Sequence, residues 1–210
     1  FSATASTSKA WISKAKGKSE YTLSLLAETT SFWYPLDYCY QRQNMVLPKL
    51  EQVEPDQIPQ PFQSLVVHQK DMTPTLEGFH GDQIYIEVLH RDYSDQYYFR
   101  EVVLKLEKNH QPVEFGAIRI FLERLPRNAR EAILKEHMPL GHILENHQVE
   151  HVSCPIGYLR MEPDQLIKKT LGDSKGQWHY GRRNRLSNPS GESLAEIIEI
   201  LPETQIELES

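Results

Sequence analysis

The spacing of apolar residues changes abruptly after Gly81. In the segment that follows, "QIYIEVLHRD", Ile84, Ile86 and Val88 recur at every second position, and this period is typical of a β-strand. Two further segments, "QYYFREVVLKLE" and "VEFGAIRIFLERL", also have strand composition, and the turn-forming "NHQP" at 109–112 joins them. Because strands connected by hairpins pair antiparallel, the middle of the chain predicts an antiparallel sheet.

Helical spacing is confined to other segments. Residues 126–146 have apolar residues on one helical face, and Pro139 is expected to divide them into two helices. Near the end of the chain, "WHYGRRNRLSNPSGESLAEIIEILP" indicates two strands around the turn "SNPSG". Five prolines between residues 35 and 61 indicate a loop. The pattern predicts an α+β fold, with a single mainly antiparallel sheet of about six strands and helices packed on one side.

The length of 210 residues suits one domain, which we expect to span residues 20–210. Residues 1–19 contain no acidic residue and are rich in Ser, Thr, Ala and Lys. We expect them to form a flexible N-terminal segment, with a targeting remnant as the alternative. No apolar run approaches the roughly 20 residues that cross a bilayer, which favours a soluble, cytoplasmic protein without a membrane partner.

Charge and motifs argue against several classes of function. The chain has 29 acidic and 23 basic residues, and its formal charge of −6 disfavours a nucleic-acid partner. The nine histidines and two cysteines include no HExxH pair and no zinc-finger spacing, so we expect no metal. No nucleotide-binding motif occurs, and we therefore expect no cofactor. A local basic pocket for a small anion is compatible with all of this, and the oligomeric state is left open.

The segment "HQKDMTPTLEGFHGD" predicts a helix start that also suits an anion. Thr73 is expected to cap a helix whose first position is Pro74, and Gly81 is expected to end it. The backbone N–H groups of a first turn have no intrahelical partners, so they can bind a carboxylate or phosphate. Most capped helices bind nothing, and this local pattern does not decide between the two.

Two charged residues lie in apolar strand patterns. Arg100 shares its face with apolar neighbours in "YFREVVLKL", so it either pairs with a structural carboxylate or binds an anion. Glu199 shares its face with Ile197 and Leu201, and it is either an exposed edge residue or a buried acid that holds a proton. Glu196, on the opposite face, is the competing candidate.

Five short motifs, in the same order, resemble the chorismate lyase family in its divergent bacterial or cyanobacterial-type branch. "KDMTPTLE" resembles the family's "DSMT" stretch, "YFREVVL" its "WLREILL" strand, and "FGAIRIF" its Gly-Arg-Thr strand. "MPLGHILE" resembles its "TPLGRYLF" helix start, and "GRRNRL…SG…IIEILP" its "GRRSRL…SG…TELFLP" ending. The family's glutamate lies four residues before the closing proline, and here Glu199 lies one residue from that position.

The resemblance implies a cofactor-independent lyase that converts chorismate to pyruvate and 4-hydroxybenzoate for quinone or related aromatic biosynthesis. It implies that Glu199 transfers a proton and that Arg100 clamps a substrate carboxylate. Backbone N–H groups near Met72 and Leu140 would contact the substrate, with Arg183 as a third cationic contact. The alternative is a sensor domain of the same fold, which binds a small acid without converting it.

Overall fold

The computed structural model describes residues 31–93, 97–172 and 176–203. Contacts divide the chain into residues 1–32 and a second unit that begins at Trp33, and this second unit contains the helices and strands described below. The predicted flexible segment at 1–19 lies outside the described residues.

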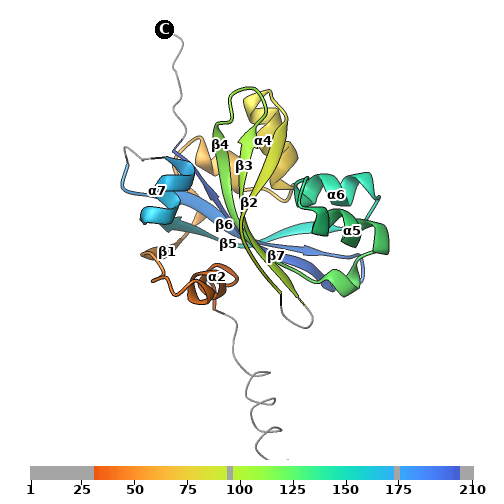
Figure 1. Cartoon of the computed structure of the whole chain (residues 1–210). Coiled ribbons are helices and arrows are strands. Elements are labelled where there is room, and N and C mark those ends of the chain that lie inside the picture. Colours follow the sequence, from red (N-terminus) through yellow and green to blue (C-terminus); the bar gives the residue numbers. More distant parts are fainter. Residues whose placement is uncertain (1–30, 94–96, 173–175, 204–210) are drawn as a thin grey trace, which may run out of the picture. The chain divides into compact units, whose positions relative to one another are not determined.

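A single sheet of seven strands organises the second unit (Figure 1). All neighbouring strands pair antiparallel, in the spatial order β1-β5-β6-β7-β4-β3-β2. The strands are β1 (Leu50–Val53), β2 (Ile84–Tyr93), β3 (Tyr98–Leu106), β4 (Pro112–Ile120), β5 (Val152–Met161), β6 (His179–Ser187) and β7 (Ser193–Leu201).

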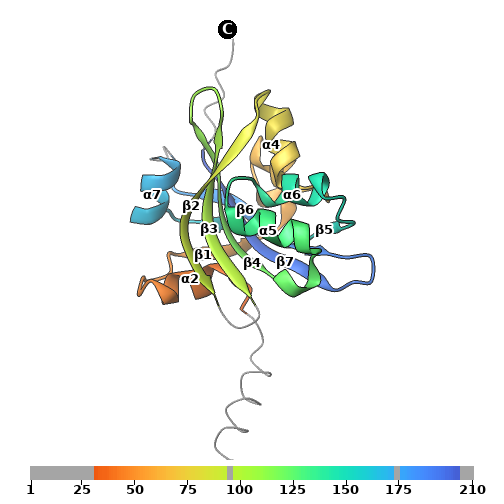
Figure 2. The same cartoon turned by 45° about the vertical axis from the view of Figure 1, so that its right-hand side comes forward.

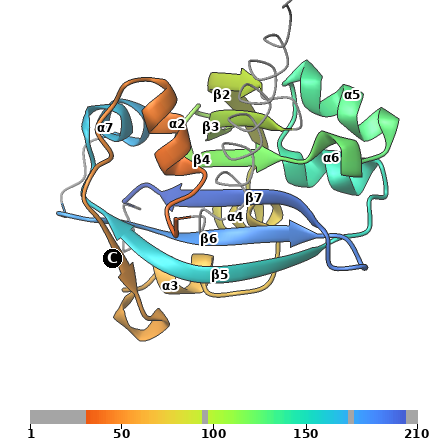
Figure 3. The same ribbon diagram turned by 90° about the horizontal axis from the view of Figure 1, so that it is seen from below.

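Helices contact both faces of this sheet (Figure 2). They are α2 (Leu36–Arg42), α3 (Phe62–Val66), α4 (Met72–His80), α5 (Arg127–Lys135), α6 (Leu140–Asn146) and α7 (Gln165–Leu171). Helices α3 to α6 lie on the side that carries the cavity described below, whereas α2 and α7 contact β3 and β4 from the other side (Figure 3). Two short 3-10 turns, Pro55–Gln57 and Leu122–Arg124, complete the described elements.

Strand β3 is buried on both faces because it lies between these layers. Side chains of a strand alternate in direction, so Arg100 and Val102 point to the side of α4 and α6. Phe99 points the other way and stacks on Tyr38 of α2, with ring centroids 4.1 Å apart. Glu101, on the same side as Phe99, accepts a hydrogen bond from Gln43. A polar side chain at the centre of this sheet is therefore removed from water, whichever face it takes.

The predicted α+β fold with one antiparallel sheet is confirmed, and Pro139 separates α5 from α6 as expected. The prediction of a loop over residues 35–61 is wrong, because this segment contains α2, β1 and a 3-10 turn. Its prolines lie at element boundaries, where they cost no internal hydrogen bond: Pro35 precedes α2, and Pro55 opens the 3-10 turn. Strand β1 is the seventh strand that the sequence did not reveal.

Among the described helices, none is both long and apolar enough to span a membrane.

Adjacent residues of α5 give a direct test of the packing. Ile133 is completely buried, while Leu134 is 43% exposed. Ile133→Ala should lower the free energy of unfolding by about 2–5 kcal/mol, because the truncation leaves a cavity in the core. Leu134→Ala is the matched control and should change it by less than about 1 kcal/mol. Chemical denaturation of both variants measures the difference, and equal losses would contradict this packing of α5.

Candidate functional site

A small cavity lies between the sheet and the first turns of α4 and α6. Its volume is about 40 Å³. Apolar side chains from five strands form much of its lining: Ile86, Val102, Leu104, Ile118, Leu186 and Ile197. Six polar residues also line it: Asp71, Thr73, Arg100, Glu114, Asn184 and Glu199. The cavity therefore combines a largely apolar wall with a few convergent polar groups, as small-molecule sites do.

The cover of the cavity begins with α4, whose start differs from the prediction. The helix begins at Met72, with Asp71 as the N-cap residue, so the predicted cap at Thr73 is wrong. Pro74 is the third residue of the helix, where its missing N–H still costs nothing, because the first four N–H groups have no intrahelical partner. Gly81 ends the helix in the left-handed conformation, with φ of 62°, as predicted.

Asp71 does not cap α4 with its side chain, because its carboxylate binds His151. The Nε2–H of His151 donates to Asp71 Oδ2 over 2.7 Å, and Nδ1 lies 2.8 Å from the carbonyl oxygen of Val149. Both ring nitrogens thus face acceptors, which suits the protonated imidazolium. The bond to Asp71 accordingly raises the pKa of His151 above its usual value.

Helices α4 and α6 meet above the cavity. A Cβ added at Gly141 would lie 3.5 Å from Thr73 Oγ1, an ordinary van der Waals distance, so the two first turns lie next to each other. Further along, His142 of α6 lies 3.2 Å from the Glu77 carboxylate of α4. These contacts close the side of the cavity that faces away from the sheet.

Arg100 is fully buried, and none of its three guanidinium nitrogens has a hydrogen-bond partner among the described residues. The nearby Glu136 is already used, because its two oxygens accept from Tyr98 and Arg91 at 2.5 Å each. Burial lowers the pKa of Arg100, while Tyr98 and Glu136 act in the opposite direction. A buried cation without a partner is costly, so the site retains unused capacity to bind an anion.

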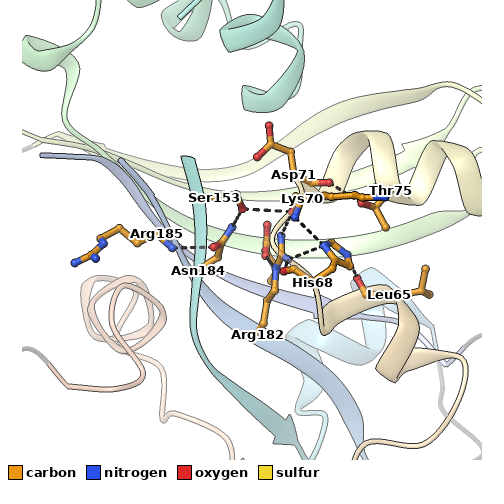
Figure 4. Close-up of polar contacts among 10 residues, drawn as sticks. Leu65, His68, Lys70, Asp71, Thr75, Ser153, Arg182, Asn184 and Arg185 are labelled. Carbon is orange, nitrogen blue, oxygen red and sulfur yellow. Dashed lines mark hydrogen bonds and ion pairs between the residues drawn. The ribbon is translucent and has the colours of Figure 1, made fainter. Parts of the chain in front are cut away.

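Glu199 is buried and forms an ion pair with Arg182, the residue directly opposite it on β6. Arg182 also donates from Nη1 to the carbonyl oxygen of His68 and from Nη2 to that of Lys70, each over 3.1 Å (Figure 4). One fully buried arginine thus joins β6 and β7 to the segment that leads into α4.

His68 is held as a neutral ring by these contacts. Its Nε2 lies 2.7 Å from the carbonyl oxygen of Leu65, while its Nδ1 accepts from the Lys70 backbone N–H over 3.1 Å (Figure 4). Burial and the nearby charge of Arg182 both lower the pKa of His68. The ring therefore fixes the backbone between α3 and α4 without adding a charge to the site.

Glu114 is the buried acid that the sequence interpretation missed. It lies on β4, is 4% exposed, and its Oε2 has no hydrogen-bond partner among the described residues. Burial raises the pKa of Glu114 well above its usual value, and the neighbouring Glu199 raises it further. A signal was present in the sequence, because "PVEFGAIRI" is nearly continuous in apolar residues apart from this glutamate and an arginine.

The structure brings together four of the five predicted site residues. Met72, Arg100, Leu140 and Glu199 all line the cavity. Arg183 does not, because β6 directs its neighbours Arg182 and Asn184 to that face and Arg183 to the other. Of the two candidate glutamates, Glu199 lines the cavity, whereas Glu196 forms an ion pair with Arg119 over 2.6 Å.

Within the described ranges, no three acidic, His or Cys side chains are grouped to hold a metal ion.

No family model and no curated protein matches this chain. Among solved structures, the effector domain of PhnF from Mycobacterium smegmatis is 10% identical, with a TM-score of 0.50 over 66% of this chain and 91% of that one. YydK from Bacillus subtilis, described as a possible transcriptional regulator, is 12% identical, with a TM-score of 0.44 over 57% of this chain and 59% of that one.

A GntR-family transcriptional regulator from Bacillus cereus is 10% identical, with a TM-score of 0.42 over 60% of this chain and 96% of that one. The chain thus spans 59% of YydK and 65% of PhnF itself. The match to the PhnF effector domain shows the fold.

The prediction that the chain is an enzyme is corrected by the match to the PhnF effector domain. The structure that shares the fold is described as an effector domain and not as a lyase. The site itself differs from the expected chemistry as well. Glu199, predicted to hold a transferable proton, instead makes an ion pair with Arg182.

The two buried arginines should respond oppositely to the same substitution. Arg100→Met removes a buried charge without a partner, so the free energy of unfolding should rise by about 1–3 kcal/mol. Arg182→Met leaves Glu199 buried without its cation and should lower it by about 3–5 kcal/mol. Urea denaturation at neutral pH measures both, and a strongly destabilised Arg100→Met would show that Arg100 has a structural partner after all.

The His151–Asp71 pair predicts a pH-dependent stability. Because the folded-state pKa of His151 is raised, its contribution is fully present below the unfolded value of about 6.5 and is lost as pH rises through the folded value. Asp71→Asn should therefore destabilise the protein more at pH 5.5 than at pH 8.5. Unfolding curves of both proteins at the two pH values test this, and a loss that is independent of pH would contradict it.

Proposed function

We propose that this chain is a ligand-binding domain that takes a small organic acid into the cavity beneath α4 and α6 without converting it. The observation that carries the proposal is Arg100, a fully buried guanidinium in the cavity lining that has no hydrogen-bond partner in the described part of the chain. Its planar fork matches the two oxygens of a carboxylate, which would satisfy it in a bidentate geometry.

The charges around the cavity support a ligand with a single negative charge. The Glu199 carboxylate is balanced by Arg182, and the Asp71 carboxylate by His151 when that ring is protonated. Glu114 is neutral when it holds its proton. Arg100 is then the one uncompensated charge among the lining residues. Of the acids that the resemblance to chorismate lyases implies, 4-hydroxybenzoate, a monoanion, fits this balance better than the dianion chorismate.

The size of the cavity supports a sensing role. A volume of about 40 Å³ holds about three water molecules, so an aromatic acid enters only if the cover moves. The cover is made by the first turns of α4 and α6, including Met72 and Leu140. A ligand that binds only when this cover is open increases the fraction of molecules in the open conformation. Binding of the ligand is thereby converted into a change of shape. The fold shared with the PhnF effector domain agrees with this role.

Within this proposal, the predicted site residues have distinct tasks. Arg100 binds the carboxylate, and Glu199, held by Arg182, presents a fixed polar wall. The backbone at Met72 offers first-turn N–H groups beside the same cavity, so it is placed to assist Arg100. Leu140 contributes apolar cover from α6, which has only seven residues.

Binding of 4-hydroxybenzoate tests the proposal. At a concentration 100 times its Kd, a ligand of the folded state should stabilise the wild-type protein by about 2.7 kcal/mol, measured as a shift in thermal unfolding. Arg100→Met should abolish the shift, because the carboxylate loses its cation. Arg183→Met is the matched control, since Arg183 lies on the same sheet but outside the cavity lining. It should retain the full shift.

Three results would contradict the proposal. The wild-type protein could show no shift with 4-hydroxybenzoate, benzoate or chorismate. Arg100→Met and Arg183→Met could lose binding equally, which would place the ligand elsewhere. Release of pyruvate from chorismate by the purified chain, measured with a coupled dehydrogenase assay, would show catalysis where we propose binding alone.

A further inference from the structure

Glu114 and Glu199 form a buried pair of carboxyls at one end of the cavity. Glu199 is paired with Gly116 across β7 and β4, and Glu114 lies two residues from Gly116 on the same face. Such diagonal positions are roughly 7–8 Å apart at the backbone, within reach of glutamate side chains. Both residues are 4% exposed, so water screens neither of them.

Gly116 provides the space for the Glu114 side chain. A Cβ added at Gly116 would lie 3.3 Å from Glu114 Oε1 and 3.2 Å from Val102 Cγ2, closer than side chains normally pack. Because that Cβ is missing, the Glu114 carboxyl can lie over Gly116. Glu199 is the residue that pairs with Gly116 on β7, so the Glu114 carboxyl lies in the direction of Glu199.

The cation at this end of the cavity is fully engaged. Arg182 directs Nε to Glu199, Nη1 to His68 and Nη2 to Lys70, which uses all three of its nitrogens. Arg100 lies opposite Ile118, four residues along β4 from Glu114, so their backbones are about 13 Å apart. Two buried carboxyls thus share one cation, and the balance of charge is restored if Glu114 holds a proton.

We infer that Glu114 is a specificity-determining residue that stays protonated and donates a hydrogen bond to an uncharged acceptor oxygen of the bound acid. The inference rests on the proposed function, in which Arg100 holds the carboxylate of the ligand. It adds that Glu114 contacts the opposite end of that ligand. Oε2 of Glu114 has no protein partner among the described residues, so this group is available to the ligand.

The chemical class of the ligand follows from this assignment. A hydroxyl, ether or carbonyl oxygen can accept a hydrogen bond from the protonated Glu114 without adding a second negative charge. A second carboxylate at this end would meet the negative charge of Glu199, and the nitrogen of an aromatic amine is a poor acceptor for this hydrogen bond. The preferred ligand is therefore a monocarboxylic acid with an uncharged oxygen at its far end.

Three benzoates that differ in one substituent atom test the inference: 4-hydroxybenzoate, 4-aminobenzoate and 4-methylbenzoate. The hydroxyl can accept from Glu114, the amino group mainly donates, and the methyl group does neither. By titration calorimetry at pH 6.5, the wild-type protein should bind the hydroxy acid roughly fivefold or more tightly than the other two. Glu114→Leu should bind all three equally, within about twofold.

Glu101→Leu is the matched control, because Glu101 is an equally buried glutamate on the opposite face of β3. It should keep the wild-type preference. If Glu114→Leu does not fold, Glu114→Met serves in its place. Its side chain has no hydrogen-bond donor, so this variant should also bind the three benzoates about equally.

The outcomes separate this inference from the proposed function. A preference for 4-hydroxybenzoate that is unchanged in Glu114→Leu, or in Glu114→Met, would overturn the role of Glu114 and leave the acid site intact. Tighter binding of 4-aminobenzoate by the wild-type protein would show that Glu114 accepts a hydrogen bond from the ligand instead of donating one, and would also overturn the inference. Failure of all three acids to bind the wild-type protein would overturn the proposed function and this inference together.

Discussion

The contact between Arg182 and Glu199 holds the parts of the site together. Arg182 is fully buried on β6, binds the carboxylate opposite it on β7, and donates to two backbone carbonyls in the segment before α4. A buried ion pair is weak support for stability by itself, because desolvation offsets much of the attraction. Here it determines position: it fixes where Glu199 stands in the cavity and where the chain enters α4.

The cover of the cavity depends on that anchored segment. His68 and Lys70 are held by Arg182, and Asp71 is held by His151 from the segment after α6. The start of α4 is thus attached at two points, one to the sheet and one next to β5. In the function we propose, a ligand that enters moves this cover against these contacts, and Arg100 gains a partner that it lacks among the described residues. Binding of the ligand would then change the shape of the domain.

Much of the fold could be predicted from the sequence, because strand and helix periods persist through each element. The hairpins of β2, β3 and β4, the break at Pro139 and the pairing of β6 with β7 all follow from local patterns. Strand β1 could not be predicted in this way, because its four residues cover only two periods of strand alternation, and prolines surround it. It exists through pairing with β5, which is a tertiary effect.

The site was predictable only in part. Arg100 and Glu199 stand out because each charge shares its strand face with apolar residues. Choosing Arg182 over its neighbour Arg183 requires the register between β6 and β7, and a shift of one residue exchanges the two faces. Glu114 was missed because its neighbours Val113 and Phe115 point to the other face, and the next residue on its own face, Gly116, has no side chain. The apolar Ile118 follows on that face, and because both faces of this sheet are covered, Glu114 is buried with it.

The central claim is that the guanidinium of Arg100, which has no partner within the described ranges, binds the carboxylate of a small acid. A crystal structure of the chain with 4-hydroxybenzoate would test it most directly. The account predicts both carboxylate oxygens within about 3 Å of the Arg100 nitrogens, beneath displaced first turns of α4 and α6. A bound acid whose carboxylate lies elsewhere, with Arg100 hydrogen-bonded to a protein carboxylate, would contradict it.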